Sequence, residues 1–522
     1  MGKPGLTFLL ILLCCNDYSS SQGFCPYKCQ CFTPDQVLCS DERMTSLPTN
    51  VSSQVKEVIV ITSAVTYLFT HTLQESPQIT KLIFLNNALR SIHSKAFECL
   101  TELQELEVSG NPWLEHLFLG TFSKQENLTK LLLNFNRFST VPSGLFDSLK
   151  QLEILQMKSN IISSLPAFLF VNLNRLRVLE LSQNKLEEIT NETFSGLERL
   201  EILKINYNLI SNLTLNTFHN LSQMNELHLE GNKITQLSDD VFSALTKLRV
   251  LNLRGNRLTS FADKVFGFEP SHLEELNLQG NRLAELSSLS SLTSLTNLIL
   301  SSNQLSGLQE NLFTNVTALE NLDLSENQLT SLPERIFRGL LSMNTINLHR
   351  NNLSTVDAKL FMDQVFIQRL YLSDNQLQSL PVGLLDSFVI QHTVRLHGNP
   401  WKCDCHMWYL HDWALRSSRD IEMLDRVLCE SPDFLRKQNI VSVDKDQLVC
   451  RLPKDDAADL STCSLQGSND TMIIKCKTAK CSAVTVKVQF QRDDGSIREH
   501  IFLNESGDFQ CSNETLNERN IY

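Results

Sequence analysis

The chain has 522 residues, of which 42% are hydrophobic, and a formal net charge of −12. This hydrophobic fraction is close to that of globular proteins and argues against a disordered chain. The acidic balance, without a long basic run, disfavours a cationic surface for nucleic acid or anionic membrane. The length allows two to four ordinary domains, or one long repeat array with caps.

The N-terminus has the pattern of a secretory signal peptide, which we place at residues 1–23. Lys3 supplies a positive start, an apolar core runs from Leu6 to Cys15, and small or polar residues follow. Such a core is about half of the ~20 residues that a membrane-spanning helix needs. No other stretch is apolar and long enough, and the polar end does not resemble a lipid-anchor signal. We therefore expect a secreted, extracellular protein without a membrane anchor.

The cysteines form groups that predict disulfide-stapled modules. Two of the 15 lie in the predicted signal peptide, and twelve of the other thirteen fall into three groups of four. The groups are Cys25, Cys29, Cys31 and Cys39, then Cys403, Cys405, Cys429 and Cys450, and finally Cys463, Cys476, Cys481 and Cys511. Such grouping is typical of secreted chains. Cys99 is left over, and we expect a buried thiol there, with an intermolecular bridge as the alternative.

A repeat occupies residues 55–399, where the pattern L-x-x-L-x-L-x-x-N recurs about every 24 residues. Asparagine fills its last position from Asn87 to Asn399, and Ser63 fills it in a degenerate first copy. The period is that of leucine-rich repeats, in which stacked coils bury leucine edges that one coil cannot bury alone. We expect an α/β solenoid of about 14–15 coils, a horseshoe with parallel strands on its concave side.

Two further side chains recur with the leucines. The amide of the repeated asparagine has donors and an acceptor, which suits backbone groups where the chain leaves the strand. A phenylalanine follows ten residues later in ten coils, at 97, 146, 170, 194, 218, 242, 266, 313, 337 and 361. Its regularity predicts a packed spine under the convex side, and a ligand-binding aromatic box is the alternative. The 22-residue coil between Asn281 and Asn303 lacks it.

The strand positions two, four and six residues before each repeated asparagine should face solvent. In the first coils these positions and one adjacent residue are apolar, namely Ile59, Ile61, Ile83, Leu85, Leu132 and Phe135. An exposed apolar cluster predicts a site of protein contact, unless the N-terminal cap folds over it. In the last coils the same positions are polar and basic, as at His349, Arg369, Tyr371, Arg395 and His397, which suits a solvated face.

Ten Asn-x-Ser/Thr acceptors support the extracellular setting. They are Asn50, Asn127, Asn191, Asn212, Asn220, Asn315, Asn352, Asn469, Asn504 and Asn513. Within the repeats, none lies among the six residues that precede a repeated asparagine. The predicted concave face should therefore be free of glycan.

The segments beside the array resemble the caps of extracellular leucine-rich-repeat proteins. CPYKCQCF lies in the N-terminal cap, residues 24–54, and NPWKCDCHMWYLHDWAL lies in the C-terminal cap, residues 400–451. The resemblance implies the bridges Cys25–Cys31, Cys29–Cys39, Cys403–Cys429 and Cys405–Cys450. CDCH could also indicate a zinc site, but disulfides are favoured in a secreted cap.

A longer resemblance includes VLCSDERMTSLP, KLIFLNNALRSI, LLLNFNRFSTVPSGLF and a tail, STCSLQGSNDTMIIKCKTAKC, that ordinary leucine-rich-repeat proteins lack. Over nearly the whole mature chain, the sequence resembles the large, non-catalytic subunits of plasma zinc carboxypeptidases. This implies a glycosylated regulatory subunit that binds, stabilises and retains in circulation a catalytic subunit removing C-terminal Arg or Lys. A hetero-tetramer is implied.

The tail, residues 452–522, alternates apolar residues as at Val484, Val486, Val488 and Phe490, which predicts a small β module. Its four cysteines should form two bridges, whose pairing the spacing leaves open. The module could dock a partner or simply cap the chain.

An enzymatic role is disfavoured. His272 and Glu275 have the spacing of a zinc motif, but Leu273 and Leu276 are repeat leucines. The nearest third ligand, His392, lies five coils away, roughly 24 Å along a sheet, so the three cannot share a metal. We predict no catalytic site, metal or cofactor. A serum inhibitor of an enzyme such as a phospholipase, and a soluble innate-immune or matrix recognition protein, remain as alternatives.

Overall fold

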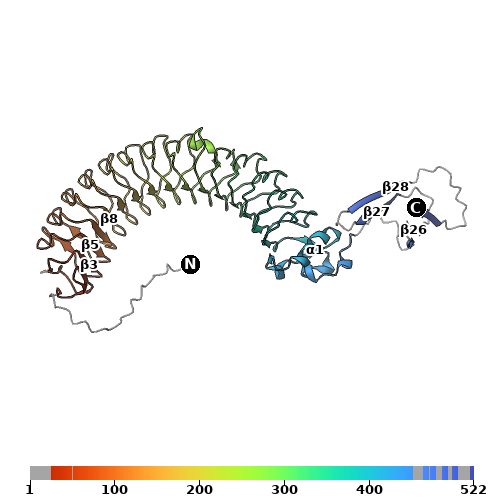
Figure 1. Cartoon of the computed structure of the whole chain (residues 1–522), viewed down its shortest axis with the longest axis horizontal. Coiled ribbons are helices and arrows are strands. Elements are labelled where there is room, and N and C mark those ends of the chain that lie inside the picture. The colour runs from red at the N-terminus through yellow and green to blue at the C-terminus, as the bar shows by residue number, and fades with distance from the viewer. Residues whose placement is uncertain are drawn as a thin grey trace. The chain divides into compact units, whose positions relative to one another are not determined.

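The computed structural model describes residues 25–49 and 51–450 in full, and the backbone of five strands between residues 463 and 521 (Figure 1). These residues form two compact units, which divide near Leu248. The predicted signal peptide, the acceptors Asn50, Asn469, Asn504 and Asn513, and the cysteines Cys481 and Cys511 lie outside the described residues. Across the described part of the chain, no helix has the length and apolarity needed to cross a membrane.

Unit 1 contains a parallel sheet with one strand from each coil. Its strands are β3 (Glu57–Ile61), β5 (Lys81–Leu85), β7 (Glu105–Ser109), β8 (Lys130–Leu132), β9 (Ile154–Gln156), β10 (Val178–Glu180), β11 (Ile202–Lys204) and β12 (Glu226–His228). Neighbouring strands pair one repeat apart, so that Leu179 lies beside Leu155 and Leu203. Figure 1 shows the labelled strands β3, β5 and β8 along the inner side of this curved stack. Their inward residues, such as Val58, Leu82 and Leu131, are buried because alternate side chains point into the coil.

Unit 2 repeats the arrangement. Its parallel strands are β13 (Val250–Asn252), β15 (Glu275–Asn277), β17 (Asn297–Ile299), β18 (Asn321–Asp323), β19 (Thr345–Asn347), β20 (Arg369–Tyr371), β21 (Thr393–Arg395) and β23 (Ile421–Glu422). Two-residue strands pair outside the main sheets, β4 (Tyr67–Leu68) with β6 (Ser91–Ile92) and β14 (Ser260–Phe261) with β16 (Glu285–Leu286). The remaining convex segments of both units are chains of turns, with one 3-10 helix, η1 (Asp263–Phe266).

The repeated asparagines form the ladder that their chemistry predicts. Asn184 Nδ2 donates to the carbonyl of Met157 in the preceding coil at 2.9 Å and to Leu181 in its own coil at 3.0 Å. Its Oδ1 accepts from the backbone N–H of Ile162 at 3.1 Å. Asn351 of unit 2 makes the same three contacts with its own two coils. Each asparagine thus satisfies buried backbone groups that would otherwise remain unpaired.

The repeated phenylalanines form a buried spine, so the aromatic-box alternative is wrong. All ten are at most 8% exposed. In unit 1, Phe122 joins Phe97, Phe146 and Phe170 in a stack with ring centroids 6.2–6.4 Å apart. In unit 2, Phe337 stacks between two neighbours in the same way. The regular offset therefore marks packing within the core.

The spine is interrupted in the 22-residue coil of unit 2. Ser291 stands ten residues after Asn281, where other coils have phenylalanine. Its backbone N–H donates to Asp263 Oδ2 at 2.9 Å, and the Asp263 side chain is buried. A hydrogen bond to a buried carboxylate thus replaces a ring contact at this level of the stack.

Both caps are held by disulfides. At the N-terminus, β1 (Cys29–Thr33) pairs with β2 (Gln36–Cys39), and β2 continues the sheet in parallel with β3. The C-terminal cap contains β22 (Trp401–Lys402), β24 (Cys429–Ser431), α1 (Trp408–Arg416), and the 3-10 helices η2 (Cys405–Met407), η3 (Leu424–Arg426), η4 (Asp433–Leu435), η5 (Ile440–Ser442) and η6 (Lys445–Gln447). The bridges are Cys25–Cys31, Cys29–Cys39, Cys403–Cys429 and Cys405–Cys450, the four pairings that the resemblance implied.

The tail forms strands, as its alternation predicts. One sheet contains β25 (Cys463–Ser468), β26 (Thr471–Lys477) and β29 (Glu518–Ile521), and a second pairs β27 (Thr485–Gln491) with β28 (Ile497–Leu503). All these pairings are antiparallel. Cys463 and Cys476 are backbone partners across β25 and β26.

Candidate functional site

The first coils of unit 1 present apolar side chains on the strand face, the solvent side of the parallel sheet. Ile59 and Ile61 of β3 lie beside Ile83 and Leu85 of β5, and all four are half-buried. Leu38 of β2 extends the row, because it is the register partner of Ile59 and is also half-buried. We call these five residues the N-terminal apolar patch. Sequence analysis missed Leu38, although the alternation in QVLC is its signal.

Two of the predicted contact residues differ from that patch. Leu132 is only 8% exposed, so its prediction as an exposed contact residue is wrong. Its register neighbours, Glu107 and Gln156, have longer side chains. Strand alternation predicts the direction in which a side chain points, but not how far the neighbouring side chains extend beyond it. Phe135 is 55% exposed, at φ +54°, an unusual backbone conformation for an aromatic residue.

The N-terminal cap does not fold over the apolar patch. β2 lies beside β3 in register, with Val37 opposite Val58, and so lengthens the sheet. The hairpin partner β1 adds at the next position. The described part of the cap therefore covers the end of the hydrophobic core and leaves the patch half-exposed on the strand face.

An ion-pair ladder borders the patch. Glu105 of β7 lies between Lys81 and Lys130, with Oε2 3.4 Å from Lys81 Nζ and Oε1 2.7 Å from Lys130 Nζ. Burial raises the pKa of Glu105, but the hydrogen bonds and charges of the two lysines outweigh it and lower that pKa overall. Glu105 is thus paired on both sides, and the three charges together leave a net charge of +1 beside the patch.

The strand face of the last coils in unit 2 is polar and internally paired. The Arg395 guanidinium lies 4.1 Å from the ring centroid of Tyr371. It also donates to both carboxylate oxygens of Glu422, at 2.7 and 2.9 Å. His349 Nδ1 lies 2.8 Å from Ser373 Oγ. Sequence analysis found the basic residues here but not Glu422, which the C-terminal cap contributes.

A second apolar surface lies on the flank of the first coils, where sequence analysis predicted none. A groove of about 580 Å³ is lined by Tyr67, Phe69, Phe118 and Leu119, together with Leu68, Ser91, His93 and Ser94. These four side chains are between 46% and 71% exposed. Cys99 of the same coils is half-buried, with its Sγ 3.6 Å from His71 Nδ1. It is the free cysteine of the described residues, and it is less buried than predicted.

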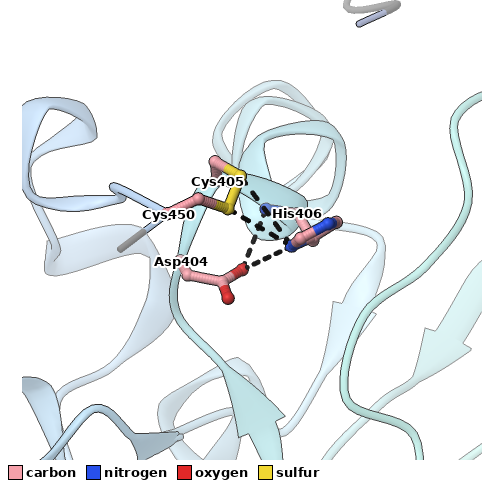
Figure 2. Close-up of side chains that lie close together, drawn as sticks. All are labelled: Asp404, Cys405, His406 and Cys450. Carbon is pink, nitrogen blue, oxygen red and sulfur yellow. Dashed lines mark hydrogen bonds and ion pairs between the residues drawn. A yellow bond between two sulfur atoms is a disulfide. The ribbon is translucent and has the colours of Figure 1, made fainter. Parts of the chain in front are cut away.

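The CDCH segment places four potential metal ligands close together, as Figure 2 shows. Cys405 and Cys450 are bonded to each other, so neither sulfur is available as a thiolate ligand. His406 Nδ1 lies 3.0 Å from Asp404 Oδ1, and Lys402 Nζ lies 2.8 Å from Asp404 Oδ2. Burial raises the pKa of Asp404, but these hydrogen bonds lower it overall. The cluster is a disulfide beside an ion pair.

The residues of the zinc-enzyme alternative do not come together. Leu273 and Leu276 are fully buried, and Glu275 begins β15. His392 precedes β21, which is five strands from β15 in unit 2, roughly 24 Å at the usual strand spacing. Three ligands at ~2 Å from one metal cannot span that distance.

All six acceptor asparagines that lie in described coils are exposed. They are Asn127, Asn191, Asn212, Asn220, Asn315 and Asn352. None belongs to a strand of the two parallel sheets. The segment 51–126, which contains most of the apolar patch and the flank groove, has no acceptor.

Comparison with known proteins agrees with this architecture. The family described as Leucine rich repeat matches overlapping segments that together span residues 126–377. A leucine-rich-repeat protein of Leptospira interrogans has a similar structure, with a TM-score of 0.63, 25% identity, and 74% of this chain and 94% of that chain covered. Toll in its complex with Spatzle, from Drosophila, has a TM-score of 0.56 at 20% identity, covering 82% and 73% of the two chains, which shows the fold alone.

Two curated relatives match part of the sequence. Carboxypeptidase N subunit 2 of Homo sapiens is 34% identical over 118 residues, covering 18% of this chain and 22% of that protein. The Mus musculus protein of the same name is 32% identical over 132 residues, covering 21% and 24%. The matched segments thus span about a quarter of the relatives or less, a shorter resemblance than the nearly complete one expected from the motifs. The chain thus has the leucine-rich-repeat fold, and about a fifth of it is similar to carboxypeptidase N subunit 2.

Proposed function

We propose that this protein is a secreted, glycosylated regulatory subunit that binds and stabilises a zinc carboxypeptidase and retains it in the circulation. The enzyme removes C-terminal Arg or Lys, and the subunit described here has no catalytic role. The similarity to carboxypeptidase N subunit 2 carries the choice of partner. A hetero-tetramer, as the resemblance implies, is part of the proposal.

The N-terminal apolar patch is the proposed contact site. Leu38, Ile59, Ile61, Ile83 and Leu85 lie side by side on an open sheet and are only half-buried. Clustered apolar area of this kind stabilises a complex when a partner removes it from water. Phe135 lies farther along the same unit and offers an exposed aromatic side chain, a type that is enriched at binding hot spots.

The distribution of acceptor asparagines supports this site. Glycans on the exposed acceptors would cover the loops between strands, whereas residues 51–126 have no acceptor. The coils between residues 51 and 126, which present four of the five patch residues, would therefore carry no bulky, hydrated sugar of their own. Mass spectrometry of tryptic glycopeptides should find sugar on the six exposed array asparagines.

Co-expression with the catalytic subunit of a zinc carboxypeptidase tests the proposed partner. We expect both chains to elute together in size-exclusion chromatography with light scattering, and the bound enzyme to keep its activity longer at 37 °C. Separate elution of the two chains at micromolar concentrations, with no change in the half-life of the enzyme, would overturn the proposal.

A glycan placed on the patch tests the site. Ile83→Asn with Leu85→Thr creates an acceptor on β5, and we expect its glycan to abolish binding. Ile299→Thr makes Asn297 an acceptor at an outward position of β17 in unit 2 and serves as the matched control. If both glycosylated variants bind like the wild type, another surface is the contact site.

A further inference from the structure

Two polar side chains of β7 lie at the edge of the N-terminal apolar patch without partners. Glu107 and Ser109 are two residues apart in the strand, but Glu107 is half-buried whereas Ser109 is buried. Glu107 is the register partner of Ile83, and Ser109 is the register partner of Leu85. On the other side of Glu107 lies Leu132. A carboxylate and a hydroxyl are thus set among aliphatic side chains.

The Glu107 carboxylate differs from its neighbour Glu105 on the same strand. Glu105 forms ion pairs with Lys81 and Lys130. Within the described part of the chain, neither of the carboxylate oxygens of Glu107 has a hydrogen bond or an ion pair, although the side chain is half-buried. A charge that is partly removed from water without a partner is unfavourable, and a cation from outside would relieve this.

The Ser109 hydroxyl beside Glu107 belongs to the interior of the coil. Ser109 is 2% exposed, and among the described residues its Oγ has no hydrogen-bond partner. The Ser109 carbonyl accepts from the backbone N–H of Asn86 at 2.9 Å and from Asn111 Nδ2 at 3.0 Å. Ser301 of unit 2 has the same buried hydroxyl at the same repeat position, so Ser109 is a feature of the coil and is not accessible to a ligand.

We propose that Glu107 receives the side chain of a lysine or arginine from the bound protein. Lysine and arginine only donate hydrogen bonds, and the Glu107 carboxylate accepts them. The aliphatic stem of the incoming residue packs on Ile83 and Leu85 of the adjacent strand. This inference deepens the proposed function, because it requires that a protein binds the strand face.

Other occupants fit less well. An acidic or phosphorylated segment is repelled by the unpaired Glu107 carboxylate. A wholly apolar segment would bury that carboxylate without a partner, which costs more than the apolar contact gains. A metal ion lacks ligands, because Glu107 belongs to no group of three metal-binding side chains in the part of the chain that the structure describes.

Selection of displayed random 12-residue peptides on the immobilised full-length chain tests the chemistry of the occupant. We expect enrichment of lysine or arginine flanked by apolar residues. Glu107→Gln should weaken a selected peptide at least tenfold, whereas Ser109→Ala, which changes only a buried hydroxyl, should leave its binding unchanged. Glu180→Gln, at the same strand position of β10 but between Gln156 and Lys204, should change nothing. Unchanged far-ultraviolet circular dichroism and Tm verify that each variant is folded.

Charge reversal gives the sharpest result. Glu107→Lys should shift the selected peptides from basic to acidic residues. Enrichment without basic residues, no enrichment at all, or equal binding by wild type and Glu107→Gln would overturn the proposed lysine or arginine site.

Binding of a zinc carboxypeptidase catalytic subunit, measured by biolayer interferometry with the same variants, separates this inference from the proposed function. If the enzyme binds the wild type and Glu107→Gln equally, the cation site is wrong and the proposed partner stands. If the enzyme does not bind the wild type but basic peptides bind in a Glu107-dependent manner, the proposed partner is wrong and the cation site stands.

Discussion

The strand faces of the first and the last coils use equivalent positions in opposite ways. In the first coils, Ile59 and Ile83 occupy the middle row of outward positions, and the carboxylate of Glu107 beside them has no partner among the described residues. In the last coils that row holds Tyr371 and Arg395, and Arg395 is paired with both an aromatic ring and a carboxylate. One face leaves apolar area and a carboxylate unmatched, whereas on the other face Arg395 contacts both Tyr371 and Glu422.

This difference separates the proposed binding surface from a surface that stabilises its own fold. Each face lies above a core of leucines and a ladder of asparagines in its own unit, so the type of core does not distinguish them. What differs is whether the outward side chains find partners within the chain. Unmatched groups in a folded protein indicate contacts that come from outside, whereas matched polar groups need no further partner.

The largest effect on stability should be equal in the two units, because each contains a spine of buried phenylalanines. Phe146→Ala in unit 1 and Phe337→Ala in unit 2 each remove a fully buried ring and should cost about 3–5 kcal/mol in the free energy of unfolding. Chemical denaturation followed by tryptophan fluorescence measures both. A cost below about 1 kcal/mol in either unit would show that the two spines are not equivalent.

The second effect should appear in binding and only in the first coils. Ile83→Ser removes apolar area from the patch, and we expect at least a tenfold loss of partner affinity, about 1.4 kcal/mol. Asn347→Ser changes the same row in the last coils and should leave affinity unchanged. Surface plasmon resonance with both variants decides whether the contrast holds. Equal losses would place the contact along the whole array.

A smaller effect on stability should appear only in the last coils. Hydrogen bonds from Arg395 lower the pKa of Glu422, so this pair stabilises the fold above the ordinary pKa of glutamate, about 4.5. The contribution is lost as pH falls through the lowered pKa of Glu422. Because both side chains are more than a third exposed, Glu422→Gln should cost only about 0.5 kcal/mol near neutral pH. Thermal melts between pH 3 and 7 should show a flatter acid limb for the variant.

The smallest effect concerns His397 of the last coils. Burial lowers its pKa from the ordinary value of 6.5, so the unfolded chain takes up a proton at a higher pH than the folded chain does. The related stability is fully present above about pH 6.5 and falls as pH drops toward the lowered pKa. His397→Gln should make the melting temperature depend less on pH between pH 7 and 5. The corresponding difference in the free energy of unfolding should be below about 1 kcal/mol. An identical pH profile for both proteins would contradict this.

The fold could be predicted from the sequence because the same residue pattern recurs in each coil. Leu179, Asn184 and Phe194 recur at fixed offsets, and their burial follows from those offsets alone. The 22-residue coil was recognisable by length, but its contact between Ser291 and Asp263 was not, since it joins a backbone N–H and a side chain of different coils. The cap bridges came from a resemblance and not from spacing.

The candidate site was only partly predictable. Alternation places Ile59, Ile83 and Leu132 on the outward face, but only the neighbours decide that Leu132 is buried. The pairing of Arg395 with Glu422 joins residues from a repeat and from the cap, 27 positions apart. The flank groove forms between coils from side chains outside the repeat consensus. Such contacts depend on spatial proximity, which the repeat pattern does not encode.

The coil that contains Ser291 affects how folding and unfolding spread along the array. In a stack where each unit touches only its neighbours, the chain behaves as a one-dimensional lattice, and its weakest coupling limits the length over which coils melt together. Stacked rings run from Phe313 through Phe361, whereas the Ser291 coil contributes no ring to the spine. Hydrogen bonds such as that from Ser291 to Asp263 depend on direction far more steeply than ring contacts. That coil is therefore the place in unit 2 where we expect partial unfolding to begin or to stop.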